Sequence, residues 1–214
     1  MSGSGGEDVP NGTNGTNGRT YPRTITAGGE VELRPMQPGD RDAVLAFAQG
    51  LPTHDVLFLP RDITHPKVLD AWIAENEHGA MVTLLALRGK VVVGCATIVR
   101  DPLSWSPHVG ELRIVVASDA RGHGLGRILT EDAFAIAVAQ GVEKMVAHMT
   151  ADQLGAIAVF ETMGYRAEAL LRDHVKDRDG VKHDLVILSH DVAGFRARMA
   201  AYGVGEALET DAAS

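Results

Sequence analysis

The hydrophobic pattern of the chain changes repeatedly between the period of a strand and that of a helix. Apolar and polar residues alternate over residues 111–117, and further apolar runs follow a similar strand pattern. The predicted strands cover residues 31–34, 81–88, 90–100, 111–117, 144–150, 165–175 and 181–189. The predicted helices cover residues 40–49, 66–76, 128–140 and 152–163. This order predicts an α/β fold in which a mixed sheet is flanked by helices.

Both ends of the chain are poor in apolar residues. An Asn-Gly-Thr repeat occupies residues 11–18, and small or polar residues dominate residues 203–214. Such segments cannot bury a core. We therefore expect residues 1–28 to be a disordered tail and residues 29–192 to form one domain with a full core. Residues 193–214 are expected to form a short helix and a flexible tail.

A glycine-rich turn, Arg121-Gly-His-Gly-Leu-Gly-Arg127, joins the strand at residues 111–117 to the next helix. A turn between a strand and a helix directs free backbone N–H groups and the positive end of the helix dipole toward one point. Because Gly122, Gly124 and Gly126 have no Cβ, the oxygens of a ligand can approach the backbone closely. The turn therefore predicts a phosphate-binding site.

Two common phosphate-binding loops do not fit this turn. The P-loop requires a Gly-Lys-Ser/Thr sequence, and no such lysine follows these glycines. The dinucleotide fingerprint requires a glycine where Arg127 stands. The pattern that remains is Arg-x-x-Gly-x-Gly, read from Arg121. A turn that merely joins a strand to a helix is the structural alternative, which the fixed arginine and glycine spacing disfavours.

The Arg-x-x-Gly-x-Gly pattern resembles the signature motif of the GNAT superfamily, the acyl-CoA-dependent N-acyltransferases. The resemblance implies a mixed sheet of about six to seven strands that splays between the fourth and fifth strands, flanked by about four helices. It also implies acetyl-CoA as the co-substrate, with an amide near Val115 or Val116 as the oxyanion donor. The residues that it assigns to acetyl-CoA are Ile114, Val115, Val116, Arg121, Gly122, His123, Gly124, Leu125, Gly126, Arg127 and Gln153.

The helix predicted at residues 152–163 carries the second part of the resemblance. Its sequence Gln153-x-x-Ala156-x-x-x-Phe160-x-x-x-Gly164-Tyr165 resembles the Asn-x-x-Ala-x-x-x-Tyr-x-x-x-Gly-Phe of family members. Gln153 keeps the amide that is expected to contact pantetheine. Phe160 replaces a tyrosine that protonates the leaving thiolate in many relatives, so this role falls to another group, to water or to none. We interpret Phe160 as a core aromatic residue.

Two residues are candidates for the base that removes a proton from the acceptor amine. Glu111 lies ten positions before Arg121 and, by strand alternation, shares a face with Arg113 and Val115. A glutamate at this spacing is the base in several branches of the family. His148 lies on the facing strand, and histidine suits proton abstraction near neutral pH. Glu111 can alternatively be a strand-end carboxylate paired with Arg113, and His148 a polar residue bonded in the sheet.

These features predict an N-acetyltransferase that moves an acetyl group from acetyl-CoA to a primary amine by direct attack in a ternary complex. The segments at residues 33–51 and 179–186, together with Glu111, resemble the catalytic domain of bacterial protein-lysine acetyltransferases. The acceptor is therefore expected to be a protein lysine or a small-molecule amine. A non-catalytic acyl-CoA-binding sensor is the alternative, because Phe160 lacks a hydroxyl.

Composition narrows the range of partners. The 214 residues carry a formal net charge of -8, which argues against nucleic acid or an anionic membrane. No apolar run approaches the roughly 18 residues of a membrane-spanning helix.

A single cysteine, Cys95, excludes an internal disulfide, and we expect a cytoplasmic enzyme. We expect no metal site, because no histidine forms an i, i+4 helical pair with a carboxylate. A homodimer stays open.

Overall fold

The computed structural model describes residues 19–194, which form one eight-stranded sheet in the order β1-β2-β3-β4-β5-β6-β8-β7. The α-helices are α1 (Arg41–Gln49), α2 (Pro66–Glu77), α3 (Leu125–Ala139) and α4 (Leu154–Thr162). The strands are β1 (Arg23–Thr26), β2 (Glu30–Pro35), β3 (Met81–Arg88), β4 (Val91–Val99), β5 (Val109–Val116), β6 (Lys144–Thr150), β7 (Arg166–Lys176) and β8 (Lys182–Asp191). Short 3-10 helices η1 (Pro38–Asp40), η2 (Thr53–Val56) and η3 (Ser118–Ala120) lie in the connections. Every strand and helix predicted within residues 31–189 is present.

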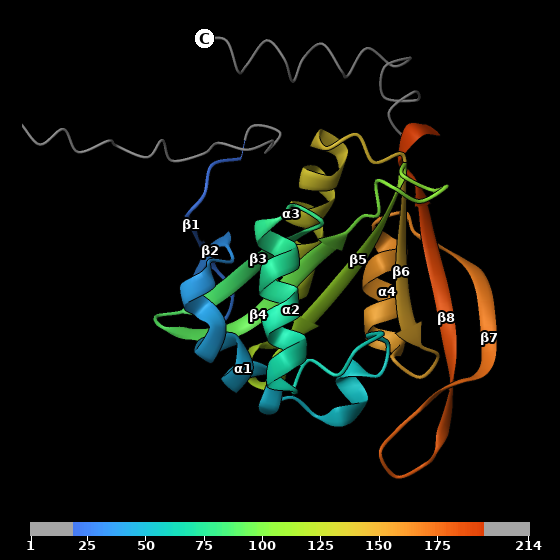
Figure 1. Ribbon diagram of the computed structural model, residues 1–214, viewed down its shortest axis with the longest axis horizontal. Coiled ribbons are helices and arrows are strands. Elements are labelled where there is room, and N and C mark those ends of the chain that lie inside the picture. The colour runs from blue at the N-terminus through green and yellow to red at the C-terminus, as the bar shows by residue number, and fades with distance from the viewer. Residues whose placement is uncertain (1–18, 195–214) are drawn as a thin grey trace, which may run out of the picture.

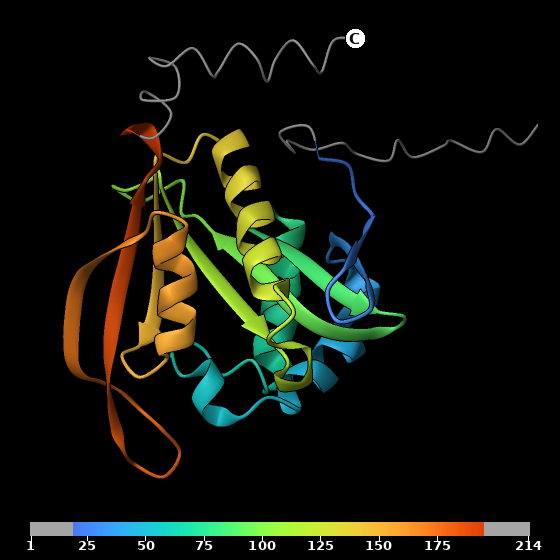
Figure 2. The ribbon, with the colours of Figure 1, turned by 180° about the vertical axis from the view of Figure 1, so that it is seen from behind.

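The sheet separates two layers of helices. α1 and α2 cover one face, and α3 and α4 cover the other (Figures 1 and 2). The face under α1 and α2 buries a cluster that includes Val44, Leu69 and Val115. The face under α3 and α4 buries a larger cluster that includes Leu112 and Leu129. Leu112 and Val115 therefore point to opposite faces of β5, as the alternation of side chains along a strand requires.

β5 and β6 diverge after a short parallel stretch. β5 pairs with β4 over six residue pairs but with β6 over only three, the last of which joins Glu111 to Val146. This is the predicted splay. β5 and β6 are the fourth and fifth of the strands predicted from the sequence, because that prediction did not include β1. Beyond Glu111, the side of β5 that faces β6 lacks a partner strand among the described residues.

The N-terminal segment differs from its prediction. The expectation of a disordered tail up to residue 28 is wrong for its last part, because β1 pairs with β2. Asp132 of α3, which is fully buried, accounts for this strand. Tyr21 and Arg23 donate hydrogen bonds to its carboxylate, and Arg19 forms an ion pair with it. Residues 1–18 and 195–214, including most of the predicted C-terminal helix and tail, lie outside the described residues.

Asp40 stands at the N-cap position of α1, but its side chain does not cap that helix. The carboxylate accepts the N–H of Gln37 at 2.8 Å and two hydrogen bonds of 2.6 and 2.7 Å from Arg34. The Arg34–Asp40 pair therefore fastens the end of β2 to the start of α1.

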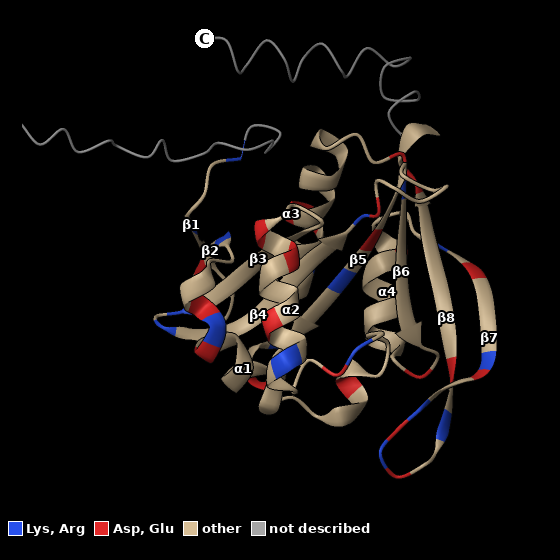
Figure 3. Cartoon of the chain, viewed as in Figure 1, with Lys and Arg blue, Asp and Glu red and all other residues tan. Residues whose placement is uncertain are grey.

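Charged residues of both signs are interspersed over α1, α2 and the β7–β8 hairpin (Figure 3). The net charge of -8 is therefore not gathered into one acidic patch on this face. Among the described residues, no helix combines the length and the apolar character needed to cross a membrane.

Candidate functional site

A cavity of about 720 Å³ opens in the splay beside β5. Its walls are β5, the glycine-rich turn, the starts of α3 and α4, and the η2 segment. The lining includes Ile114, Val115, Val116, Arg121, Gly122, Gly124, Leu125, Gly126, Arg127, His148 and Gln153. The structure thus gathers around one cavity the residues that the sequence assigns to acetyl-CoA, except His123. It also adds His54 and Asp55 of η2 and Phe58 just after it, which no local motif indicates.

The backbone of the glycine-rich turn is shaped for an anion. Gly122 and Gly124 have φ angles of 79° and 81°, a left-handed conformation that residues with a Cβ rarely adopt. The first N–H that bonds back into α3 is that of Ile128, which donates to the Gly124 carbonyl at 3.1 Å. The N–H groups of residues 125–127 precede this point and have no carbonyl one turn before them in the helix. Together with the positive end of the helix dipole, they are available to an anion.

Arg121 ties the turn to its surroundings. Its guanidinium donates to Asp55 at 2.6 Å and, through two nitrogens, to the Val116 carbonyl at 2.9 and 3.1 Å. Its side chain therefore connects the turn with the end of β5 and with η2, while the backbone amides carry the anion site.

The other side chains of the turn serve different purposes. The His123 ring lies against Gly28, where a Cβ would come within 2.7 Å of it, so this ring anchors the turn on the N-terminal segment. Leu125 is buried in the core. Arg127 is bonded to Glu131 at 2.8 Å, one helical turn later. The side chains of these three residues are therefore engaged with other parts of the protein.

Alternate residues of β5 direct their backbone groups toward β4 and into the splay. The N–H of Ala117 donates to the Val93 carbonyl of the β4 strand at 2.9 Å. Because backbone groups alternate along an antiparallel strand, the backbone of Val115 also faces β4. The backbone groups of Ile114 and Val116 face the splay instead. Of the two predicted oxyanion donors, this register favours the Val116 amide.

Glu111 and His148, the two predicted bases, lie together where the parallel pairing ends. His148 Nδ1 is 3.5 Å from Glu111 Oε1. Arg113 donates two hydrogen bonds of 2.8 Å to the Glu111 carboxylate, as the structural alternative from the sequence anticipates. The carboxylate is therefore fixed in position by Arg113 and still faces His148.

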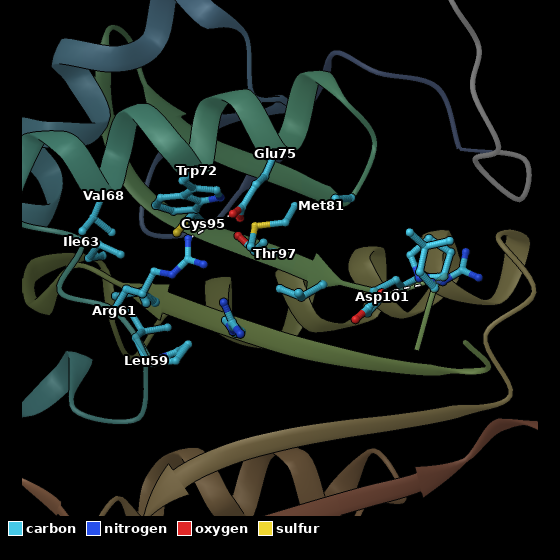
Figure 4. A pocket seen from close by; sticks show the side chains of 18 residues that line it. Leu59, Arg61, Ile63, Val68, Trp72, Glu75, Met81, Cys95, Thr97 and Asp101 are labelled. Atoms are coloured by element: carbon cyan, nitrogen blue, oxygen red, sulfur yellow. Dashed lines mark hydrogen bonds and ion pairs between the residues drawn. The ribbon is translucent and has the colours of Figure 1, made fainter. Parts of the chain in front are cut away.

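A second cavity, of about 540 Å³, lies on the other face of β5 beneath α2 (Figure 4). Its lining is mostly apolar and includes Leu59, Ile63, Val68, Trp72, Met81, Val99 and Val115. Arg113, which holds Glu111, also lines this cavity, and Val115 lines both cavities. The two cavities therefore share Val115 of β5, and Glu111, which lines neither, is bonded to Arg113 of the second cavity.

The start of α4 borders the first cavity. Gln153 lies at its N-cap, and its side-chain amide is 3.5 Å from the His54 carbonyl, a distance typical of a weak hydrogen bond. Phe160 is 5% exposed and packs edge-on against Tyr165, with 4.9 Å between ring centroids. Its interpretation as a core aromatic residue agrees with this packing.

His54, Asp152 and His183 converge from η2, the β6–α4 turn and β8. Their ligand atoms lie within 4.8 Å of one another, and His54 Nε2 is 3.0 Å from Asp152 Oδ2. His183 also hydrogen-bonds Asp177 at 2.9 Å, which lowers the pKa of that carboxyl. Two imidazoles and a carboxylate are groups that a divalent metal ion can use as ligands. The sequence, which predicts no metal site, gives no local spacing that would reveal this group.

A family model matches residues 51–165, just over half of the chain, and spans the glycine-rich turn, both predicted bases and Gln153. This model describes the acetyltransferase (GNAT) family. The chain belongs to the GNAT family. As a GNAT acetyltransferase, it is an acyl-CoA-dependent N-acetyltransferase, and the resemblance to the GNAT superfamily is confirmed. No curated protein matches the chain in sequence.

Solved structures share the fold. A GNAT acetyltransferase from Streptococcus pneumoniae is 20% identical with a TM-score of 0.66, over 75% of this chain and 99% of that one. A ribosomal-protein-alanine N-acetyltransferase from Brucella melitensis is 24% identical with a TM-score of 0.65, over 74% and 98% of the two chains. A spermidine N-acetyltransferase from Vibrio cholerae, in complex with CoA and spermine, is 15% identical with a TM-score of 0.64, over 76% and 96%. The predicted GNAT fold, with its mixed sheet, is confirmed.

Proposed function

We propose that this GNAT acetyltransferase moves the acetyl group of acetyl-CoA to a primary amine by direct attack within a ternary complex. The observation that carries the proposal is the pair of cavities on opposite faces of β5, which share Val115. One is built on an anion-binding turn, and the other is mostly apolar. A donor and an acceptor that enter these cavities meet at β5. Cys95 is an unsuitable covalent nucleophile, because burial raises the pKa of its thiol to about 12.

Acetyl-CoA suits the cavity in the splay. The N–H groups of residues 125–127 would hold the diphosphate, and the backbone groups of Ile114, which face the splay, would pair with the pantetheine arm. Gln153 lines the same cavity and offers its amide to that arm. The Vibrio cholerae structure with bound CoA supports this assignment, because it has the same fold.

Glu111 and His148 would remove the proton from the acceptor amine. An ammonium group is not a nucleophile, so it must lose a proton before it attacks the thioester. Glu111 accepts this proton, and His148, 3.5 Å away, relays it toward solvent. Arg113 keeps the carboxylate oriented during the reaction.

Stabilisation of the thioester oxygen and departure of CoA need no catalytic side chain. The Val116 amide would donate to the thioester oxygen as it gains negative charge. Phe160 has no hydroxyl to protonate the departing sulfur. A thiol has an ordinary pKa of about 8.5, so its thiolate is a good leaving group near neutral pH. We propose that CoA leaves as the thiolate and is protonated by water.

Release of free CoA thiol tests the proposal. Purified protein is mixed with acetyl-CoA and a panel of amines that includes a lysine peptide, polyamines and simple monoamines, while calorimetry measures acetyl-CoA binding. Thiol release that requires an amine supports the proposal. Tight acetyl-CoA binding without turnover on any amine would instead support the non-catalytic sensor. No heat with acetyl-CoA would overturn the assignment of the cavity.

A further inference from the structure

From the second cavity, we infer the class of the acceptor: a small primary amine on an aryl or branched-alkyl body, with an O–H or N–H donor at the end away from the amine. This inference rests on the proposed function, since it assigns the acceptor of the same reaction. It excludes polyamines and protein lysines as the preferred acceptors.

The size of the cavity fits a small molecule. Its volume of about 540 Å³ lies within the roughly 300–1,000 Å³ that is usual for small-molecule sites. Its floor crosses three neighbouring strands, with Met81 on β3, Thr97 on β4 and Val115 on β5. Adjacent strands are about 4.8 Å apart, so this floor is about 10 Å across. A lysyl side chain is a narrow, unbranched tether and would leave most of this space empty.

The charges around the cavity do not suit a polycation. The two carboxylates in its lining are those of Glu75 and Asp101. Arg61 donates to Glu75 at 3.0 Å, and Asp101 accepts the N–H of Leu103 at 3.0 Å. Arg100 and Arg113 add two further positive charges to the lining. Three arginines and two carboxylates line the cavity, and one of the arginines, Arg113, is paired with Glu111. The lining therefore has no excess of negative charge to balance the several ammonium groups of a polyamine.

Glu75 provides one unsatisfied acceptor. Its Oε1 accepts the hydrogen bond from Arg61, but its Oε2 is buried without a hydrogen-bond partner. Figure 4 shows Glu75 extending from α2 toward the space that Trp72 and Met81 also border. A buried acceptor without a partner is unfavourable until a donor reaches it. An O–H or N–H on the ligand would supply that donor at the α2 side of the cavity, away from Glu111.

Trp72 gives the cavity a rigid aromatic wall. Its indole N–H donates to the Thr83 hydroxyl at 3.0 Å, and that hydroxyl is 3.0 Å from the Thr97 hydroxyl. The ring is therefore fixed before a ligand arrives. A fixed indole between aliphatic side chains favours a flat ring or a branched hydrocarbon over a flexible polar chain.

Thiol-release kinetics with four acceptors test this inference. Tyramine has an aromatic ring and a distal hydroxyl, phenethylamine has the ring alone, and spermidine and a lysine peptide represent the excluded classes. We expect kcat/KM for tyramine to exceed that for phenethylamine about ten-fold, and spermidine and the peptide to be slower than either monoamine. In Glu75→Gln, the amide oxygen stays with Arg61 and an NH₂ group replaces the free Oε2. The preference for tyramine over phenethylamine should then fall about ten-fold.

Glu77→Gln is the matched control, because Glu77 is exposed on the same helix and does not line the cavity. It should leave the tyramine preference unchanged, and thermal unfolding should show that both variants are folded. Equal or faster turnover of spermidine or the peptide would overturn the acceptor class while leaving the proposed function intact. An unchanged preference in Glu75→Gln would likewise overturn it. Binding of tyramine to the CoA complex without thiol release would refute the proposed function but support the assignment of the cavity. If tyramine neither binds nor causes thiol release, the inference is refuted.

Discussion

The Glu111 carboxylate contacts both an arginine and a histidine. Arg113 holds both of its oxygens, and His148 lies 3.5 Å from one of them. The arginine fixes the geometry, and the histidine offers a second position for a proton. We interpret the three residues as one unit, in which removal of the carboxylate charge should affect proton transfer more than ligand binding.

Glu111→Gln should lower kcat/KM about a hundred-fold at pH 7, because a positioned general base contributes roughly 10²–10⁴-fold. The glutamine keeps the shape and a contact to Arg113, so acetyl-CoA binding should not change. The defect should narrow as the pH approaches 10, because the free amine then needs no base. A pH profile of thiol release measures this effect. Wild-type turnover across the whole range would exclude Glu111, and His148→Ala would then be the decisive variant.

The Cys95 thiol should be unreactive in the folded protein. Burial raises the pKa of its thiol to about 12, so the reactive thiolate is scarce at pH 8. The native protein should therefore release no colour with Ellman's reagent on the time scale of an assay, and one thiol should react after unfolding in guanidinium. Rapid reaction of the native protein would show that the second cavity opens to solvent beside Cys95.

At the scale of elements, the glycine-rich turn depends on two residues with positive φ. Gly124 has a φ of 81° and is the N-cap of α3. No atom lies within 4 Å of a Cβ added there, so the cost of a substitution is conformational rather than steric. Gly126 stands inside the helix, where a Cβ would touch only Val116 at 3.8 Å.

Gly124→Ala and Gly126→Ala should therefore have opposite effects on stability. Alanine at position 124 should cost about 1 kcal/mol, because left-handed backbone is unfavourable for a residue with a Cβ. Alanine at position 126 should gain about 0.5–1 kcal/mol as a better helix former. Thermal unfolding should separate the two variants by about 5 °C. Destabilisation of the same size in both would contradict the conformational explanation.

The Arg34–Asp40 pair links β2 to α1 and predicts a pH dependence. Hydrogen bonds from Arg34 hold the pKa of Asp40 below its ordinary value. A lowered pKa in the folded state stabilises the protein above the ordinary value of about 3.9, and this contribution disappears as the pH falls through the folded pKa. Asp40→Asn should cost about 1 kcal/mol at pH 7. Denaturant unfolding should show the two proteins converging as the pH falls below about 3.9; a constant difference would contradict this origin.

The strands and helices could be predicted from the sequence because their apolar periods are local. The phosphate-binding turn was equally accessible, since its glycines and Arg121 are adjacent in sequence. By contrast, β1 was missed because Arg23 and Tyr21 bond a residue more than a hundred positions away. The second cavity was not visible either, because its walls come from five separate segments of the chain. Local pattern thus predicts elements, whereas contacts between distant segments shape the second cavity.

At the scale of the whole molecule, Asp132 attaches the N-terminal strand to α3. Asp132 is fully buried, whereas Arg19 and Arg23 are 38% and 32% exposed. This attachment also brings Gly28 against His123 of the turn. The N-terminal segment therefore packs against the glycine-rich turn on the side away from the cavity and helps to hold the turn in place.

Asp132→Asn should destabilise the protein by about 2 kcal/mol. Loss of a fully buried partner costs about 3–5 kcal/mol, and the partial exposure of the arginines reduces this value. Trypsin should then cleave faster after Arg19 and Arg23. Glu131→Gln is the control, because Glu131 pairs with Arg127 on the surface and should matter by only a few tenths of a kcal/mol. Unchanged proteolysis in Asp132→Asn would show that β1 is held by other contacts.

β5 divides the interior into two chambers that have almost no residues in common. Apart from Val115, no residue lines both cavities, although β5 and the segment of residues 54–63 each contribute side chains to both. Selection, or a protein engineer, can therefore rebuild one chamber and leave the other unaltered. Proteins with this architecture can evolve new amine specificities through substitutions that do not touch the residues around the acyl donor. Val115 is the exception, because a substitution there alters both chambers.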